Sequence, residues 1–215
     1  MVNNIILVSA HPDDMEIGMG GTAAKLADAG SSLISIVLTD GRRSPNPLNL
    51  APDTLAAIRK QEGERATKVL GVSESIFCDL EDLKNAENCE KAKEKVRGVI
   101  QKTKPSEIYI LHPELDRHQS HRISGKIVIE TLHMLQISCP IWAYEVWGLF
   151  PTWDRFEDIS STIGKKIQAI QEHKSQIASI PYAEGVAGLN RWRAIFADPD
   201  ESGPGCAFAE VFLRI

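Results

Sequence analysis

The chain has 215 residues, of which 43% are hydrophobic and 25% are charged, as in ordinary globular proteins with a substantial core. Its formal net charge of −5 argues against a protein that binds nucleic acid through a basic face. No apolar run approaches the roughly 20 residues that a membrane helix needs, and the start "MVNNIILVSAHPDD" lacks the basic region of a signal peptide. We therefore expect a cytoplasmic protein without membrane insertion.

Apolar runs alternate with amphipathic segments over the first two thirds of the chain. In chain order, the pattern predicts strands and helices in turn over 4–9, 20–29, 32–39, 54–70, 75–80, 91–102, 107–113 and 121–135. A strand over 140–148, a helix over 164–179 and a last strand over 207–215 follow, and 42–53 is a Pro- and Asn-rich loop. This order predicts an α/β fold with a doubly wound, mostly parallel, Rossmann-like sheet, with helices on both faces and C-terminal strands that extend the sheet. We expect one domain over 1–215.

Polar stretches follow several of the predicted strands, at the sheet edge where α/β proteins bind ligands. The first, "AHPDDMEIGMGGT", contains glycines that approach the GxGxxG dinucleotide pattern, but Ala23 stands where the third glycine belongs. The carboxylates of Asp13 and Asp14 in front of these glycines would repel a pyrophosphate. The stretch therefore favours a metal site over a dinucleotide site.

A hydrolytic Zn²⁺ site takes three protein ligands and leaves a position for water. His11 and Asp14 supply two, and the neighbouring Asp13 is free to face a substrate. The third ligand is expected from "DRHQSHR", where His118 and His121 are three residues apart and share one face if a helix starts there. The remaining histidines lack such a setting and are expected to be structural or exposed: His112, His133 and His173.

Four stretches together resemble one known family. "AHPDDMEIGMGGT" resembles the signature of the zinc-dependent N-deacetylases of the LmbE-like or PIG-L group, in which AHPDD is followed by a glutamate and a pair of glycines. "RKQEGERATKVLG" is similar to the RxxExxxAxxxLG helix of that group, "HPELDRHQSH" to its loop of the form HPxxDxHxDH and "KKIQAIQEHKSQ" to its KxxAxxxHxSQ helix. The resemblance spans most of the chain, and the form "EIGMGGT" is shared with the members of bacillithiol-pathway type.

By position, the resemblance implies a role for each site residue. The metal ligands are matched by His11, Asp14 and His121, the general base by Asp13, and the histidine that stabilises the oxyanion or protonates the leaving amine by His118. The implied reaction removes the N-acetyl group from a GlcNAc-type sugar or small sugar conjugate, with Zn²⁺ or another divalent ion activating water.

The resemblance also implies the surroundings of these groups. Arg59 matches an arginine that contacts the sugar in some members, and Asp116 and Ser120 are expected to contact the substrate with it. Glu16 is expected behind the metal ligands. Members of the family form various oligomers, and we expect this protein to be a homo-oligomer. The partner that we expect it to bind is a small N-acetylated sugar, its substrate.

One residue departs from the family pattern, because Ser120 stands where the family has an aspartate that would orient His118 and raise its pKa. Asp116 and Glu114 are the candidates to compensate. The departure leaves open a zinc-binding protein with weak or no deacetylase activity, and a deacylase that acts on a non-sugar amide or an ester is a further alternative.

Two further sets of side chains are open to more than one interpretation. Arg42 and Arg43 fit an anionic aglycone and a solvated loop equally well. The tryptophans are expected in the core or in a subunit interface rather than stacked on a sugar: Trp142, Trp147 and Trp153.

Overall fold

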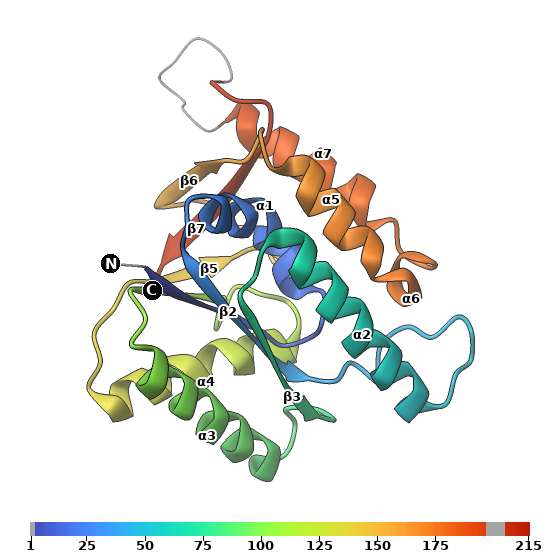
Figure 1. Ribbon diagram of the computed structural model, residues 1–215, viewed down its shortest axis with the longest axis vertical. Coiled ribbons are helices and arrows are strands. Elements are labelled where there is room, and N and C mark those ends of the chain that lie inside the picture. The colour runs from blue at the N-terminus through green and yellow to red at the C-terminus, as the bar shows by residue number, and fades with distance from the viewer. Residues whose placement is uncertain (1–2, 197–204) are drawn as a thin grey trace.

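The computed structural model describes residues 3–196 and 205–215 and contains one seven-stranded sheet (Figure 1). Its strands are β1 (Asn4–Ser9), β2 (Ser32–Thr39), β3 (Glu74–Leu80), β4 (Glu107–Leu111), β5 (Ile141–Tyr144), β6 (Arg155–Asp158) and β7 (Ala209–Arg214). The order across the sheet is β3-β2-β1-β4-β5-β7-β6. The first five strands pair in parallel, whereas β7 pairs antiparallel with both of its neighbours. The predicted doubly wound α/β fold with C-terminal strands that extend the sheet is confirmed.

Helices cover both faces of the sheet, as Figure 1 shows for α3 and α4 on one side and α1, α2 and α5 on the other. The helices are α1 (Asp14–Asp28), α2 (Pro52–Leu70), α3 (Ala86–Thr103), α4 (Gln119–Leu135), α5 (Ile163–Glu172), α6 (Lys174–Ile177) and α7 (Tyr182–Ile195). Alternate residues of β1 enter two separate cores: Ile5 and Leu7 pack with α1 and α2, and Ile6 and Val8 pack with α3 and α4. None of the described helices combines the length and the apolar character that a membrane crossing requires.

Helix α1 begins at Asp14 rather than at Gly20 as predicted, with a kink at Met19 (φ −142°, ψ 20°). The glycines that suggested a loop are used for close packing inside the helix. A Cβ on Gly18 would lie 2.3 Å from a ring carbon of Tyr144, and one on Gly21 would lie 2.7 Å from Ile159. The early start places Asp13 and Asp14 at a helix N-terminus, where the helix dipole favours negative charge.

The C-terminal third departs most from the prediction. The helix expected over 164–179 is divided into α5 and α6 at His173 (φ −80°, ψ 56°), where the chain turns to bury that side chain. Helix α7 and strand β6 were not predicted. The sequence of α7 contains two glycines and has little amphipathic character, and β6 has only four residues, so both lack a clear periodic pattern.

Candidate active site

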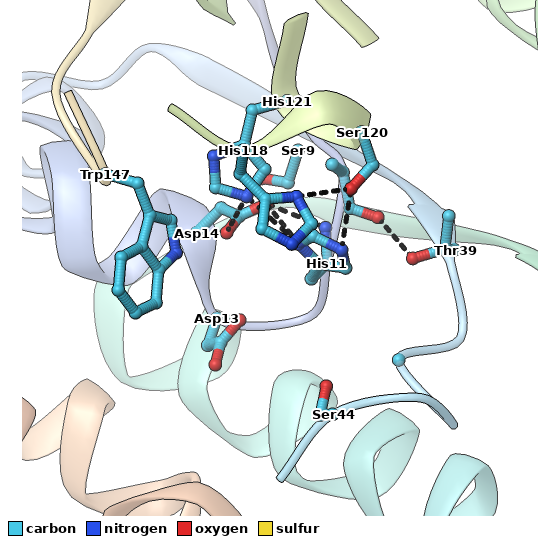
Figure 2. A network of polar contacts seen from close by, with 12 residues as sticks. Ser9, His11, Asp13, Asp14, Thr39, Ser44, His118, Ser120, His121 and Trp147 are labelled. Carbon is cyan, nitrogen blue, oxygen red and sulfur yellow. Dashed lines mark hydrogen bonds and ion pairs between the residues drawn. The ribbon is translucent and has the colours of Figure 1, made fainter. Parts of the chain in front are cut away.

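Three potential metal donors converge where β1 and β4 end, as Figure 2 shows. His11 follows β1, Asp14 begins α1, and His121 lies in the first turn of α4. Nδ1 of His11 is 3.1 Å from Nε2 of His121, and the Asp14 carboxylate lies 3.3 Å from the first nitrogen and 3.2 Å from the second. Donors that each bind a tetrahedral Zn²⁺ at 2.0–2.1 Å lie about 3.3 Å apart. The three residues therefore have the chemistry and the approximate spacing of a metal site, with the two distances to Asp14 measured to its two different oxygens.

His118 offers a second set of donors, because ring nitrogens of His11, His118 and His121 lie within 4.8 Å of one another. His118 is the N-cap residue of α4 and has an extended backbone (φ −82°, ψ 128°). The Asp14 oxygens lie 3.3 Å and 3.2 Å from the nitrogens of His11 and His121, so Asp14 and His118 are alternative third donors beside these two histidines. His118 also lies at the wall of a cavity.

Charge is strongly coupled within this cluster. Burial disfavours the charged form of His121, but the carboxylates of Asp14 and Asp116 outweigh burial and raise the pKa of His121 to about 10. Burial likewise opposes ionisation of Asp14, but His121 and His11 hold the pKa of Asp14 well below its usual value. The cluster thus holds a buried carboxylate beside a buried imidazolium. A bound cation would replace the proton of His121.

Asp116 was expected to contact substrate, and in the structure it lies behind the donor cluster. Its side chain is buried and lies outside the lining of the cavity. One oxygen lies 3.1 Å from Nδ1 of His121, and the other accepts a hydrogen bond of 2.8 Å from the backbone N–H of His118. The motif lacks a carboxylate at position 120, where the family has one beside the ring of His118. Asp116 supplies a carboxylate nearby, but it lies beside the ring of His121 instead. Such a carboxylate behind a ligating histidine fixes the orientation of the ring.

Ser120 connects the two histidines that face the cavity. Its Oγ lies 3.1 Å from Nε2 of His11 and 2.7 Å from Nδ1 of His118. Burial, followed by the neighbouring His11 and His121, lowers the pKa of His118. The hydroxyl therefore takes up the position of the family aspartate without its charge, beside a histidine whose surroundings favour the neutral ring.

Asp13 lines the same cavity, and 7% of the residue is exposed. The guanidinium of Arg59, which is 1% exposed, lies 2.9 Å from Oδ1 of Asp13. The same guanidinium contacts the Gly41 carbonyl at 3.2 Å and the hydroxyl of Ser44. Arg59 lines the cavity, as predicted for a residue that contacts the substrate. In the structure its guanidinium pairs with the carboxylate of Asp13.

A layer of buried polar groups lies behind Asp13 and Arg59. Glu62 accepts hydrogen bonds from the backbone N–H of Ser175 at 2.8 Å and from its hydroxyl at 2.7 Å. Glu16 lies 3.8 Å from Nε2 of His173. Burial opposes the charge of His173, but Glu16 outweighs it and raises the pKa of this ring. His173, expected to be merely structural or exposed, thus lies directly behind the site, and the KxxAxxxHxSQ motif was the available signal.

The cavity in front of these groups encloses about 360 Å³. Loops after β2 and β3 form one end, where Arg43 lies 2.5 Å from Glu81 and 3.0 Å from Asp82. Trp147 and Tyr182 form the other end, with Trp147 45% exposed on the cavity wall rather than in the core. Arg42 lies outside the lining and is held by carboxylates of the same loop and of α2.

Comparisons with known proteins identify deacetylases among the relatives of this chain. The chain is 30% identical over 189 residues to the diacetylchitobiose deacetylase of Thermococcus kodakarensis, covering 81% of this chain and 70% of that protein. The structure of the N,N′-diacetylchitobiose deacetylase of Pyrococcus horikoshii superimposes with a TM-score of 0.82 at 26% identity, over 99% of this chain and 84% of that one.

The same fold also occurs with other chemistry. The 4-carboxy-2-hydroxymuconate hydratase of Pseudomonas putida superimposes with a TM-score of 0.86 at 20% identity, over 100% of this chain and 96% of that one. At that identity the likeness concerns the fold alone.

The family model for PIG-L, GlcNAc-PI de-N-acetylase, matches residues 6–132, which include every donor of the cluster in Figure 2. The chain therefore belongs to the PIG-L family.

Proposed function

We propose that the protein is a metal-dependent N-deacetylase that hydrolyses the acetamide of a GlcNAc-type sugar or small sugar conjugate. The observation that carries this proposal is the group of three donors 3.1–3.3 Å apart, flanked by Asp13 on one side and His118 on the other. An amide hydrolase needs these parts: an activated water, a base and a donor for the oxyanion. The family to which the chain belongs supplies the substrate class.

His11, Asp14 and His121 are proposed to hold the ion. A divalent ion bound there supplies Lewis-acid polarisation of the acyl oxygen and lowers the pKa of water. Asp116 keeps the His121 ring in place, and the backbone N–H of His11 donates to Asp14 at 2.7 Å. Both contacts orient ligands before any ion arrives, so the site is organised in advance.

Asp13 is proposed as the general base. Arg59 occupies Oδ1 of Asp13 and leaves Oδ2 for the proton of the attacking water. The water oxygen bonds to the acyl carbon as its proton passes to Asp13, and the carbon–nitrogen bond then breaks. The amine nitrogen receives that proton back from Asp13, and the products are acetate and a free amine.

His118 is proposed to stabilise the oxyanion through an N–H donor. Its Nδ1 faces Ser120, so Nε2 is the nitrogen that remains for the substrate. Because the surroundings lower the pKa of His118, the ring donates as a neutral imidazole at neutral pH. Ser120 is thus proposed to act on the chemistry through His118, and its place in the cavity lining is compatible with the contact to the sugar that the resemblance implies.

The test is acetate release from N-acetylglucosamine, diacetylchitobiose and N-acetylglucosaminyl malate by zinc-loaded protein. The control is Asp13→Asn, which keeps the size of the side chain and the metal ligands. We expect release by the wild type, at least a hundredfold less by the variant, and equal zinc content in both. Zinc-loaded wild type that releases no acetate from any of the three substrates would refute the proposed activity.

A further inference from the structure

A second cavity, of about 330 Å³, adjoins the reaction cavity. The two share Ile17, Trp147 and Tyr182 as wall residues. Ile17 lies on α1 one turn beyond Asp13 and Asp14, so the second cavity begins about 5 Å along the helix from the proposed catalytic groups. We call it the side cavity.

The side cavity is apolar and carries no free charge. Ile17, Val146, Val186, Leu189 and Val211 contribute much of its wall. Its two carboxylates are already neutralised. Glu210 contacts Lys166 at 2.6 Å and two backbone N–H groups of α1, and Glu145 contacts Arg193 and a backbone N–H. An occupant of this cavity is therefore uncharged.

Asn190 is the uncharged amide of the wall. Its side chain is 4% exposed, and its Nδ2 donates to the carbonyl of Ala209 at 2.8 Å. Its Oδ1 is buried and has no hydrogen-bond partner in residues 3–196 and 205–215. Asn190 therefore presents no charge and no accessible acceptor oxygen to the side cavity, in keeping with an apolar occupant.

The orientation of the bound substrate determines which part of it points toward the side cavity. The sheet order places the loops after β2 and β3 on one side of β1 and the segment after β5 on the other. Figure 2 accordingly shows Ser44 and Trp147 on opposite sides of Asp13. An amide carries its acyl group and its amine substituent in opposite directions. A polar sugar suits the end with Arg43, Glu81 and Asp82, and the acyl group then points toward Trp147 and the side cavity.

We propose that the side cavity binds the acyl chain of the substrate, so that the enzyme accepts uncharged N-acyl groups longer than acetyl. This inference rests on the proposed hydrolysis of N-acyl sugars. An acetyl methyl group is about the size of one water, whose share of liquid volume is about 30 Å³. It leaves most of the side cavity unfilled.

Two glycines of α7 provide a matched pair of variants. An added Cβ finds nothing within 4 Å at either Gly185 or Gly188, and only Gly185 lines the side cavity. Gly185→Leu therefore narrows the cavity without a backbone clash, and Gly188→Leu makes the same change outside it. Leucine is a better helix former than glycine, so both variants are expected to fold.

The experiment measures binding and turnover of N-hexanoyl- and N-acetylglucosamine. Binding is measured by calorimetry on zinc-loaded protein that carries Asp13→Asn. Each buried methylene strengthens binding about fourfold, so we expect the hexanoyl compound to bind at least tenfold tighter. Gly185→Leu is expected to lower this ratio to near one, and Gly188→Leu to leave it unchanged. N-(5-carboxypentanoyl)glucosamine is expected to lose the gain, because the side cavity is uncharged.

Three results would overturn the proposal. The first is equal binding of the two compounds, and the second is tighter binding of the hexanoyl compound that survives Gly185→Leu. The third is tighter binding shown instead by the hexyl glycoside of N-acetylglucosamine, which would place the aglycone in the side cavity.

The two proposals fail separately. Acetate release with no preference for hexanoyl removes only the side-cavity assignment. A hexanoyl preference in binding without turnover of either compound leaves the cavity assigned and removes the proposed hydrolysis.

Discussion

Removing the hydroxyl of Ser120 tests the arrangement of the histidines most directly. Nδ1 of His11 faces Asp14 and His121, so its Nε2 carries the proton and donates to Oγ of Ser120 at 3.1 Å. The hydroxyl proton is then free for Nδ1 of His118 at 2.7 Å. These tautomers are assigned from the hydrogen-bond geometry. In Ser120→Ala both contacts are lost.

The size of the effect follows from these two contacts. A hydrogen bond of this kind contributes about 0.5–1.5 kcal/mol net, and the loss of an outer-shell partner typically lowers metal affinity or activity 10–100-fold. Because Ser120 is only partly buried, water can replace the hydroxyl, and we expect the lower end of this range. The contact to His11 affects zinc affinity and the contact to His118 affects kcat, each by about tenfold.

The assay combines zinc affinity, from competition with a chelator, with steady-state kcat and KM. Ser124→Ala is the matched control, because Ser124 lies on the same helix and its buried hydroxyl has no partner in the described part of the chain. We expect zinc affinity and kcat to be unchanged in the control and KM to be unchanged in both variants. If Ser120→Ala matched Ser124→Ala in zinc affinity and in kcat, the bridging role of Ser120 would be refuted.

Three further predictions concern the framework of the site. Gly18→Ala forces α1 away from β5, so it should weaken zinc binding and lower Tm, whereas Gly98→Ala, which has open space, should raise Tm slightly. Glu62→Ala removes two buried charge-assisted hydrogen bonds and should cost about 2–3 kcal/mol of unfolding free energy in denaturant titrations, whereas the exposed Glu64→Ala should cost under about 0.5 kcal/mol. Without metal, the pKa of about 10 keeps His121 protonated at pH 7, so zinc binding should release about one proton. Calorimetry in buffers of different ionisation enthalpy measures the number of protons released. Zinc binding without proton release would contradict the prediction.

The parallel part of the fold could be predicted because its first four strands alternate with periodic helices, and β1 and β2 are mostly continuous apolar runs. The ends of elements were less predictable. The segment from Asp14 to Gly18 continues as helix before the kink at Met19, and Gly18 lets it pack against β5, a contact that no local pattern reveals. Helix α7 and strand β6 are held by β7, which is distant in the sequence.

The donor cluster could be anticipated from the histidines and carboxylates that follow β1 and β4. The partners of each group could not. Arg59 was expected to face the sugar, but the turn at Gly41 and the side chain of Asp13 surround its guanidinium. Asp116 was expected at the substrate, but it lies behind His121. Both outcomes depend on tertiary approach between segments that are separate in the sequence.

The insertion of β7 between β5 and β6 has a consequence for synthesis on the ribosome. The edge of β5 stays unpaired until β7 emerges, although the donors of the site have all been made by then. Open strand edges invite pairing with other chains. Glu210 of β7 also holds two N–H groups of α1 and the buried ammonium of Lys166. A nascent chain without β7 thus exposes a strand edge and lacks the carboxylate that pairs with Lys166, so this half of the sheet is completed only by the last strand.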